Sequence, residues 1–316
     1  MKTRRRERVT ALAVCVALLI GLARPAAAFD SGRAAFSVIV NNELVIPYRV
    51  FAVYVLPGER LRLLAGGASA KAEAGTLKSV AAGTWDWTAP ETPGVAELTF
   101  DAANDRIRIN AVILHPASKL RNGRLNGYTI GSYPAPLHGD PVYRPPVGYI
   151  ELTAANANLA LSPHFRLDQF PSKQSVNMPK YLALREALFL KLELLLEHVN
   201  EKGIATDSFV VMSGFRTPVY NHAIGNVQSS RHIYGGAADI FVDVAPKDGV
   251  MDDLNGDGKL DYRDAQYLYR LADELFSRPA NRRLRGGLGV YKSTPAHGPF
   301  LHIDARGARA RWGLLP

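Results

Sequence analysis

The chain has 316 residues, 47% of them hydrophobic, and a formal net charge of +9. This length suggests about two domains, and the apolar fraction is sufficient for a buried core. Five of the nine net positive charges fall within residues 1–28, so the rest of the chain is only mildly basic. A mild basic excess fits attraction to an anionic cell wall and gives no case for a nucleic-acid partner.

The first 28 residues are typical of a secretory signal peptide. Basic residues up to Arg8 precede an apolar run, Val9 to Leu22, and a small-residue segment, Ala26 to Ala28, follows. The run is shorter than the about 20 residues of a membrane span, although an uncleaved anchor is the alternative. We therefore expect a periplasmic or extracellular protein with no stable membrane span after cleavage. The single cysteine lies inside this segment, so the mature chain has no disulfides and its metal ligands must be histidine or carboxylate.

Residues 29–132 are predicted to form a β-sandwich-like domain. They contain short apolar or alternating runs separated by glycine and proline, which is the pattern of several strands joined by turns. The expected strands are 37–40, 45–55, 61–64, 98–100 and 106–109. No catalytic constellation occurs in this sequence, which favours a structural or docking module over a domain that binds the wall or a partner.

A proline-rich linker is predicted over residues 133–158, because five prolines fall between Pro134 and Pro146. An α+β domain follows over residues 159–316. Its first predicted helix runs from Pro179 to Lys202, with leucines at helical spacing.

Three side chains of this second domain have the chemistry of a zinc site. On one straight helix His232 and Asp239 would lie about 10 Å apart, too far to share an ion. Gly235 and Gly236 instead favour a tight reversal that brings Asp239 back toward His232. Asp239 and His302 each lie in a short apolar run typical of a strand. A turn and two strands can thus gather three ligands and leave a fourth position for water, as in catalytic zinc sites.

Several sequence segments surround these residues. They are Ser213–Pro218 (SGFRTP), Ser230–Asp239 (S-x-H-x-x-G-x-A-x-D), Gly286–Tyr291 (GGLGVY), and Phe300–Asp304 (FLHID) with Trp312. In this order they resemble the zinc D-alanyl-D-alanine carboxypeptidase superfamily, which also contains murein endopeptidases and hedgehog-like domains. The resemblance covers roughly residues 160–313. It implies a hedgehog-like α+β domain, zinc held by His232, Asp239 and His302, and hydrolysis of peptide bonds in peptidoglycan stems.

Residues 253–264 match a calcium loop of the EF-hand or dockerin type. Oxygen donors stand at loop positions 1, 3, 5, 9 and 12, position 7 can contribute its backbone carbonyl, and Gly258 stands at the sharp turn of position 6. The predicted ligands are Asp253, Asn255, Asp257, Lys259, Asp261 and Asp264. Asp264 replaces the usual glutamate of an EF-hand. The hypothesis is that calcium orders the connection between Asp239 and His302, and the alternative is an acidic surface loop with incidental spacing.

The candidates for binding and proton transfer are less well determined. Arg216 could grip a substrate carboxylate or stabilise an oxyanion, or form a structural salt bridge. Ser230 could hydrogen-bond a ligand or substrate, or stabilise the turn. Several relatives in the superfamily place Glu, Asp or His two or three residues before the last zinc ligand, where this chain has Pro299 and Phe300.

For the general base this leaves His297 and Asp304, and Asp304 could instead orient a zinc ligand. The leading prediction is a secreted zinc metallopeptidase of peptidoglycan, either a D,D-carboxypeptidase or a cross-link endopeptidase. One alternative is a catalytically silent zinc module that recognises cell-wall peptides or a protein partner. The other is a different secreted zinc hydrolase on the same scaffold.

Overall fold

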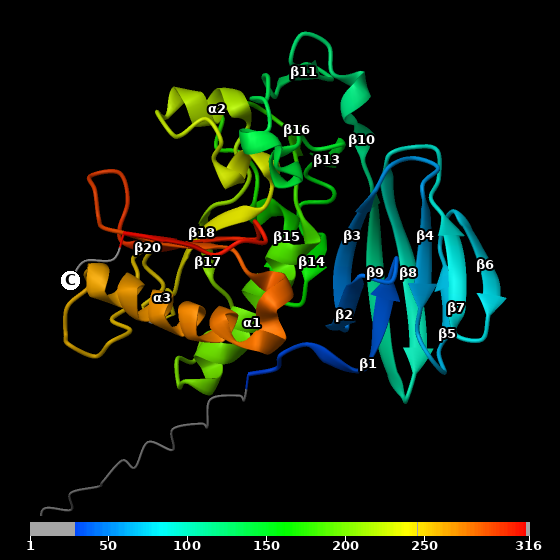
Figure 1. Ribbon diagram of the computed structural model, residues 1–316, viewed down its shortest axis with the longest axis horizontal. Coiled ribbons are helices and arrows are strands. Elements are labelled where there is room, and N and C mark those ends of the chain that lie inside the picture. Colours follow the sequence, from blue (N-terminus) through cyan, green and yellow to red (C-terminus); the bar gives the residue numbers. More distant parts are fainter. Residues whose placement is uncertain (1–28, 245, 314–316) are drawn as a thin grey trace, which may run out of the picture.

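The structure is a computed structural model that describes residues 29–244 and 246–313. Figure 1 shows two lobes, one built of strands and one in which helices accompany a sheet. The α+β fold class is therefore confirmed. The predicted signal peptide lies outside the described residues. In the part that is described, no helix is both long and apolar enough to cross a membrane.

Two sheets make up the first lobe. The five-stranded sheet has the order β2-β1-β4-β7-β6 and the four-stranded sheet the order β3-β9-β8-β5, with β3 and β9 parallel. The strands are β1 (Arg33–Val40), β2 (Leu44–Tyr48), β3 (Val50–Val55), β4 (Arg60–Leu64), β5 (Ser69–Ala72), β6 (Thr76–Ala81), β7 (Thr84–Thr88), β8 (Gly94–Ala102) and β9 (Asp105–Ile113). The predicted strand 45–55 is two strands, because the chain passes from one sheet to the other at Arg49.

Alternating burial holds the two sheets together. Along β8 every second side chain, at Ala96, Leu98 and Phe100, is buried, as expected for a strand with one face in a core. Trp85 of the five-stranded sheet packs edge-on against Phe100 of the other sheet, with ring centroids 5.7 Å apart. The two sheets thus share one hydrophobic core.

The segment between the lobes differs from the predicted linker. Residues 148–152 form a buried strand, β13 (Gly148–Leu152), which pairs with β10 (His115–Pro116) on one side and β16 (Lys180–Leu182) on the other. Because β13 supplies backbone hydrogen bonds to both neighbours, it belongs to a sheet and cannot act as a spacer. The end of the predicted β-rich domain also contacts the second lobe, since the Val219 amide donates to the Ile130 carbonyl.

Short elements precede the first long helix. They are η1 (Ala117–Lys119), β11 (Arg124–Leu125), β12 (Tyr128–Thr129), η2 (Leu137–Gly139), η3 (Pro141–Tyr143), β14 (Ala160–Ser162), β15 (Phe165–Arg166) and η4 (Leu167–Gln169). Helix α1 (Glu186–Glu201) begins later than predicted, because residues 180–182 pair with β13 as strand β16.

The second lobe contains a five-stranded sheet in the order β17-β18-β20-β19-β21. Its elements are β17 (Val210–Ser213), α2 (Pro218–Ala223), η5 (Arg231–Tyr234), β18 (Ala237–Phe241), α3 (Tyr262–Ser277), η6 (Pro279–Leu284), β19 (Gly287–Tyr291), β20 (Phe300–Asp304) and β21 (Ala310–Trp312). Helix α3 packs against β19, β20 and α1. Leu301 and Ile303 of β20 are fully buried, and by strand alternation they point to the opposite face from His302.

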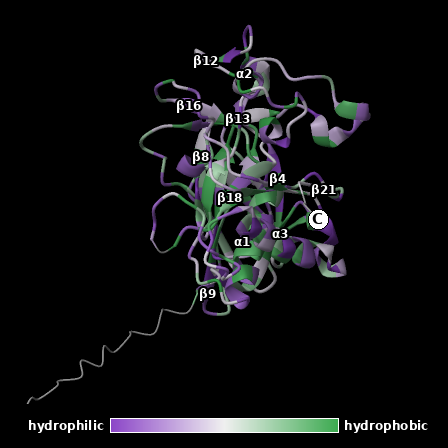
Figure 2. Ribbon diagram, turned by 90° about the vertical axis from the view of Figure 1, so that its left-hand side faces the viewer, coloured by the Kyte–Doolittle hydropathy of each residue, from purple (hydrophilic) through white to green (hydrophobic). Residues whose placement is uncertain are grey.

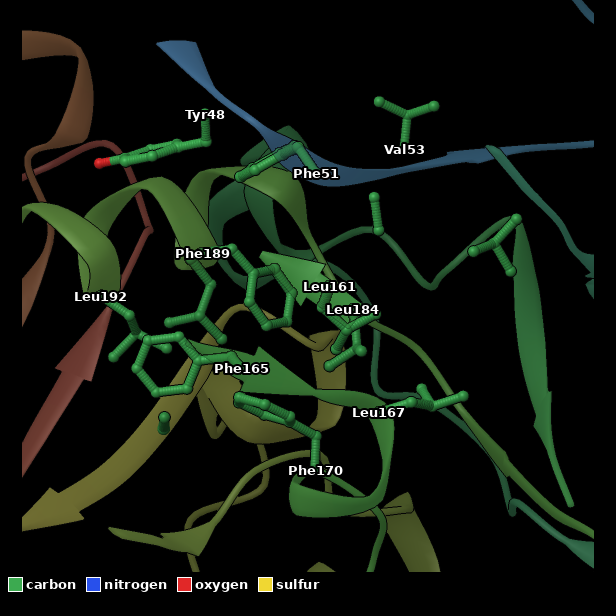
Figure 3. Close-up of a cluster of buried hydrophobic side chains, with 14 of the residues drawn as sticks. Tyr48, Phe51, Val53, Leu161, Phe165, Leu167, Phe170, Leu184, Phe189 and Leu192 are labelled. Carbon is green, nitrogen blue, oxygen red and sulfur yellow. The ribbon is translucent and has the colours of Figure 1, made fainter. Parts of the chain in front are cut away.

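Buried side chains from both lobes meet in one cluster. Figure 3 shows Tyr48 and Phe51 of the first lobe above Phe189 and Leu192 of α1. Hydrogen bonds cross the same boundary, for example from the Tyr54 amide to the Glu186 carboxylate at 3.0 Å. Figure 2 shows the hydrophobic residues concentrated on the central strands. The second lobe therefore packs against the first lobe through α1.

Candidate metal centre

Strand register brings the predicted zinc ligands together. Asp239 of β18 lies directly opposite His302 of β20 in an antiparallel pair, so both side chains share one face of the sheet. His232 lies on η5, one turn before β18 begins. The turn closes at Gly235, whose φ of 69° is in the left-handed region, and an added Cβ there would collide with the Ala183 carbonyl. The predicted tight reversal is thus present, and it places His232 over the two strands.

The three ligand atoms have separations that suit one tetrahedral ion. Asp239 Oδ1 lies 2.8 Å from His302 Nδ1 and 3.2 Å from His232 Nε2, and the two nitrogens are 3.1 Å apart. Zinc bonds of about 2.0–2.1 Å at tetrahedral angles require ligand atoms about 3.3 Å apart. All three residues are buried. His232, Asp239 and His302 therefore form a group that could hold a metal ion.

In both histidines, the ring nitrogen that faces away from the centre has a hydrogen-bond partner. His232 Nδ1 lies 2.7 Å from the Gly214 carbonyl, and His302 Nε2 lies 3.2 Å from Asp304 Oδ2. Both acceptors require a proton on that nitrogen, which leaves His232 Nε2 and His302 Nδ1 with lone pairs toward the centre. Two imidazole nitrogens and a carboxylate oxygen that face one point are a suitable set of ligands for a cation.

Electrostatics favour the metal-binding protonation states at two of the three ligands. Burial lowers the pKa of His232, which keeps this imidazole neutral. Burial alone would raise the pKa of Asp239, but the two imidazoles lower it, so the carboxylate is ionised. For His302, burial opposes the charged form, but hydrogen bonds with Asp239 and Asp304 raise the pKa.

Both carboxylate oxygens of Asp304 accept hydrogen bonds from residues outside the metal-binding group. Its Oδ1 accepts from the Gly287 amide at 2.9 Å, and its Oδ2 accepts from Arg306 Nη2 at 2.6 Å. Burial alone would raise the pKa of Asp304, but hydrogen bonds with His302 and Arg306 lower it, and the hydrogen bond with His302 contributes most to the lowering. Behind it, the buried Lys191 of α1 donates to the Asp304 carbonyl at 2.7 Å. Asp304 thus contacts the outer nitrogen of His302, and both of its carboxylate oxygens accept further hydrogen bonds.

Arg216 binds the metal ligand Asp239. Its Nη2 lies 2.5 Å from Asp239 Oδ2, and its Nε donates to Ser213 Oγ at 2.9 Å. The structure thus contains the predicted salt bridge of Arg216, which leaves Oδ1 to face the histidines. The side chain is 12% exposed, so its outer edge still borders solvent. Ser230 stands at the start of η5, where its carbonyl accepts from the Ile233 amide.

An aromatic wall borders His302. The Trp312 ring of β21 lies 5.1 Å from the His302 ring, and its indole N–H donates to the Tyr291 hydroxyl at 2.9 Å. Trp312 can lie flat here because Gly287 and Gly289 carry no side chain, and a Cβ on either would collide with the indole. The wall gives the centre an apolar edge in which Tyr291 is exposed.

His297 lies on a loop between β19 and β20. Its ring packs edge-on against Phe300, with centroids 5.0 Å apart, and its Nδ1 lies 2.8 Å from the Gly298 carbonyl. Phe300 and His302 are two residues apart on one strand face, so His297 borders the same side of the sheet. Among the described residues, the metal-binding group does not include it.

In the predicted calcium loop, side-chain oxygens accept hydrogen bonds from backbone amides of the loop itself. Asp253 Oδ1 accepts from the Gly256 amide and Oδ2 from the Gly258 amide, both at 2.7 Å. Asn255 Oδ1 accepts from the Asp257 amide at 3.0 Å. These backbone hydrogen bonds lower the pKa of Asp253, with that from Gly258 contributing most. The first half of the loop is therefore folded around the residue at position 1.

The second half of the loop caps helix α3. Asp261 Oδ1 accepts from the Arg263 amide, while Asp264 Oδ2 accepts from the Asp261 amide at 2.9 Å. Asp264 is buried, and its Oδ1 accepts from the Leu254 amide at 2.9 Å. The Lys259 amide donates to Asp257 Oδ1. In residues 29–244 and 246–313, the group of His232, Asp239 and His302 alone brings three His, Cys, Asp or Glu ligand atoms within 4.8 Å.

Residues 167–256 match the family model Peptidase M15. The match supports a peptidase and, because M15 peptidases are zinc-dependent, the assignment of the three residues as a metal-binding group. It contains His232 and Asp239 and ends before His302, which the structure adds through strand pairing. No curated protein matches this chain.

Several residues of the centre were not among the predicted site residues. The Gly214 carbonyl orients His232, and Arg306 holds Asp304. Next to His232, Arg231 is 2% exposed and lies between the rings of Tyr143 and Tyr234. Burial and the neighbouring Arg185 lower the pKa of Arg231 to about 10. The Gly214 carbonyl could not be predicted, because every residue type carries a backbone carbonyl. The sequence also does not distinguish Arg231 from an arginine on the surface.

Proposed function

We propose that the chain is an exported zinc peptidase that hydrolyses peptide bonds in peptidoglycan stems, as a D,D-carboxypeptidase or a cross-link endopeptidase. The observation that carries the proposal is the convergence of His232, Asp239 and His302, of which the first two lie in the segment similar to Peptidase M15. Zinc bound there would supply a Lewis acid and a water of lowered pKa. The amino-terminal segment, with its basic start and apolar run, supports export to the periplasm or beyond.

The residues of the chain would prepare this centre in three ways. Gly214 and Asp304 fix the tautomers of the two histidines through the nitrogens that face outward. Arg216 holds Oδ2 of Asp239 and presents its outer edge to a substrate carboxylate. The wall of Trp312 and Tyr291 excludes water from one side of the reacting peptide, which strengthens the electrostatic interactions there.

A second candidate function is a catalytically silent zinc module that recognises cell-wall peptides. The observation that favours it is the state of the two candidate bases. Asp304 is fully hydrogen-bonded to His302, Arg306 and Gly287, and His297 packs on Phe300. Under this alternative the centre binds stems without cleaving them.

Digestion of purified sacculi separates the two functions. The zinc-loaded chain and a His232→Ala variant are incubated with sacculi, and soluble muropeptides are identified by mass spectrometry. New muropeptides with the intact centre alone support the peptidase. Binding to sacculi without new muropeptides supports the silent module. Equal product from both proteins contradicts a role for the metal centre.

We also propose that residues 253–264 bind calcium, on the support of the loop pattern and of the turn at Gly258, where φ is 78°. The loop leads directly into α3, which packs on β20 and so on the strand of His302. Calcium would then stabilise the connection between the second and third metal ligands.

A further inference from the structure

Arg306 contacts two parts of the metal centre at once. Its Nε donates to both carboxylate oxygens of Asp304, at 2.9 and 3.0 Å, and its Nη2 donates to Oδ2 at 2.6 Å. The guanidinium carbon also lies 5.5 Å from the centroid of the Trp312 ring. Trp312 is in turn 5.1 Å from the His302 ring. One side chain thus contacts both the partner of a metal ligand and the aromatic wall beside that ligand.

The orientation of the Asp304 carboxylate depends on Arg306. Within the part of the chain that the structure describes, Oδ2 accepts hydrogen bonds from His302 and Arg306 alone. Oδ1 also accepts from the amides of Gly287 and Arg306, at 2.9 and 3.0 Å. Donors on both oxygens restrict rotation of the carboxylate, and the bidentate pair is the most directional of them. Because the Asp304 side chain is 0% exposed, water does not readily replace a lost donor.

The aromatic wall lies against the same carboxylate. A Cβ at Gly287 would lie 2.2 Å from Asp304 Oδ2 and 2.9 Å from Trp312 Cη2, so the carboxylate and the indole are neighbours over this glycine. A planar guanidinium can pair bidentately with a carboxylate and pack on an aromatic ring, whereas a lysine ammonium offers no such fork. The contacts of Arg306 therefore depend on its residue type.

We propose that Arg306 is a positioning residue of the metal centre, which fixes the orientation of His302 through Asp304 and at the same time fixes the Trp312 wall. Loss of the guanidinium fork should then change zinc affinity and the position of the wall together. The inference rests on the zinc centre of the proposed function and does not require that a peptide is cleaved.

The test compares zinc affinities of full-length variants by competition with a zinc chelator. Arg306→Lys keeps a positive charge beside the buried Asp304, so the variant is expected to fold, but it loses the fork. Arg62→Lys is the matched control, because Arg62 forms a similar pair of hydrogen bonds with Asp86 in the first lobe, at 2.8 and 3.0 Å. We expect the Kd for zinc to rise about tenfold in Arg306→Lys and to stay unchanged in Arg62→Lys. An unchanged Kd in Arg306→Lys overturns the proposal.

A spectroscopic measurement follows the wall itself. The chain has three tryptophans, so its indole N–H groups give three signals in a proton–nitrogen correlation spectrum, and Trp312→Phe assigns the third. Since the Trp312 indole donates to the Tyr291 hydroxyl at 2.9 Å, its signal should shift in metal-free Arg306→Lys and stay in place in Arg62→Lys. A Trp312 signal at the wild-type position in Arg306→Lys contradicts the role of Arg306 in the wall.

Combined variants test the route through Asp304. In the Asp304→Asn background the fork has no carboxylate to hold, so Arg306→Lys should change the Kd for zinc by less than about twofold. A purely structural effect of Arg306→Lys would be similar in both backgrounds. An equal tenfold loss in both therefore overturns the route through Asp304.

The same measurements separate this proposal from the proposed function. If the wild type binds zinc and Arg306→Lys binds it equally well, the positioning role fails while the zinc centre stands. If the wild type binds no stoichiometric zinc, the proposed function fails and the positioning role fails with it. Zinc binding that weakens as expected in Arg306→Lys, without release of muropeptides by the wild type, contradicts the peptidase and supports the positioning role.

Discussion

The structure builds the predicted zinc centre and the predicted calcium loop of this chain in different ways. The ligand atoms of His232, Asp239 and His302 already lie within 3.2 Å of one another. In loop 253–264, the carboxylates are bonded to backbone amides of the loop itself. The metal-binding group is assembled by the sheet, whereas the carboxylates of the loop are held by a turn.

This difference follows from what holds the ligands. Strand pairing fixes Asp239 opposite His302 whether or not an ion is present, and Gly214 and Asp304 hold the imidazoles. Carboxylates on a loop repel one another unless a cation or N–H groups compensate them, and the backbone amides of residues 253–264 provide such N–H groups. Strand pairing thus holds the metal-binding group, whereas a turn holds the carboxylates of the loop.

The largest expected effect is the loss of one sheet-borne ligand. His302→Ala should abolish stoichiometric zinc binding and muropeptide release, because two ligands remain where a catalytic site needs three. Asp253→Asn should leave the zinc content of the chain unchanged, since the loop shares no ligand with the centre. Zinc per chain, measured by elemental mass spectrometry on folded protein, checks both variants. Full zinc occupancy in His302→Ala would show that the three residues do not form the site.

The next effect concerns the partner of His302. Asp304→Asn keeps the shape of the side chain but removes the charge that orients His302, and such changes typically lower metal affinity about 10–100-fold. Competition with a zinc chelator measures this. Asp86→Asn is the control, because Asp86 accepts a similar pair of hydrogen bonds from Arg62 in the first lobe. Unchanged zinc affinity with a lost hydrolysis rate would instead make Asp304 the general base.

Two features made the metal centre predictable from sequence: the glycine turn after His232 is local, and the resemblance of the surrounding motifs implies the three ligands. The pairing of Asp239 with His302, 63 residues later in the chain, is supplied by the strand register. The beginning of α1 was not predictable in this way. Residues 180–182 have an apolar content that fits either helix or strand, and their pairing with β13, nearly thirty residues earlier in the chain, decides the outcome.

The role of Arg216 also depended on distant residues. A guanidinium group next to a metal site suits substrate binding and ion pairing equally well, and the ion pair becomes visible only through the approach of Asp239 to 2.5 Å in the fold. Gly214 orients His232 through its backbone carbonyl, a group that every residue type carries. The sequence therefore did not show which residues become hydrogen-bond and ion-pair partners once the chain is folded.

A smaller effect is expected for calcium. Addition of calcium to the zinc-loaded, calcium-free chain should raise the melting temperature by about 5 °C at a concentration 100-fold above Kd, since such binding contributes about 2.7 kcal/mol. Asp253→Asn should lose most of this response, because Asp253 is the position-1 residue around which the loop folds. Scanning calorimetry with and without calcium checks it. An equal response in both proteins, or none in the wild type, would leave the loop as an acidic turn.

The smallest effect is expected for His297. Its ring rests on Phe300 and its Nδ1 faces the Gly298 carbonyl, so His297→Gln should leave zinc affinity unchanged and hydrolysis close to the wild-type rate. A general base typically contributes about 10²–10⁴-fold, so a loss of that size at unchanged zinc content would show that the loop moves His297 to the reacting peptide. The rate of muropeptide release from sacculi distinguishes the two results. Because His297 lies on a loop while the three ligands lie on paired strands and a closed turn, this measurement also asks whether any part of the centre outside the sheet takes part in the chemistry.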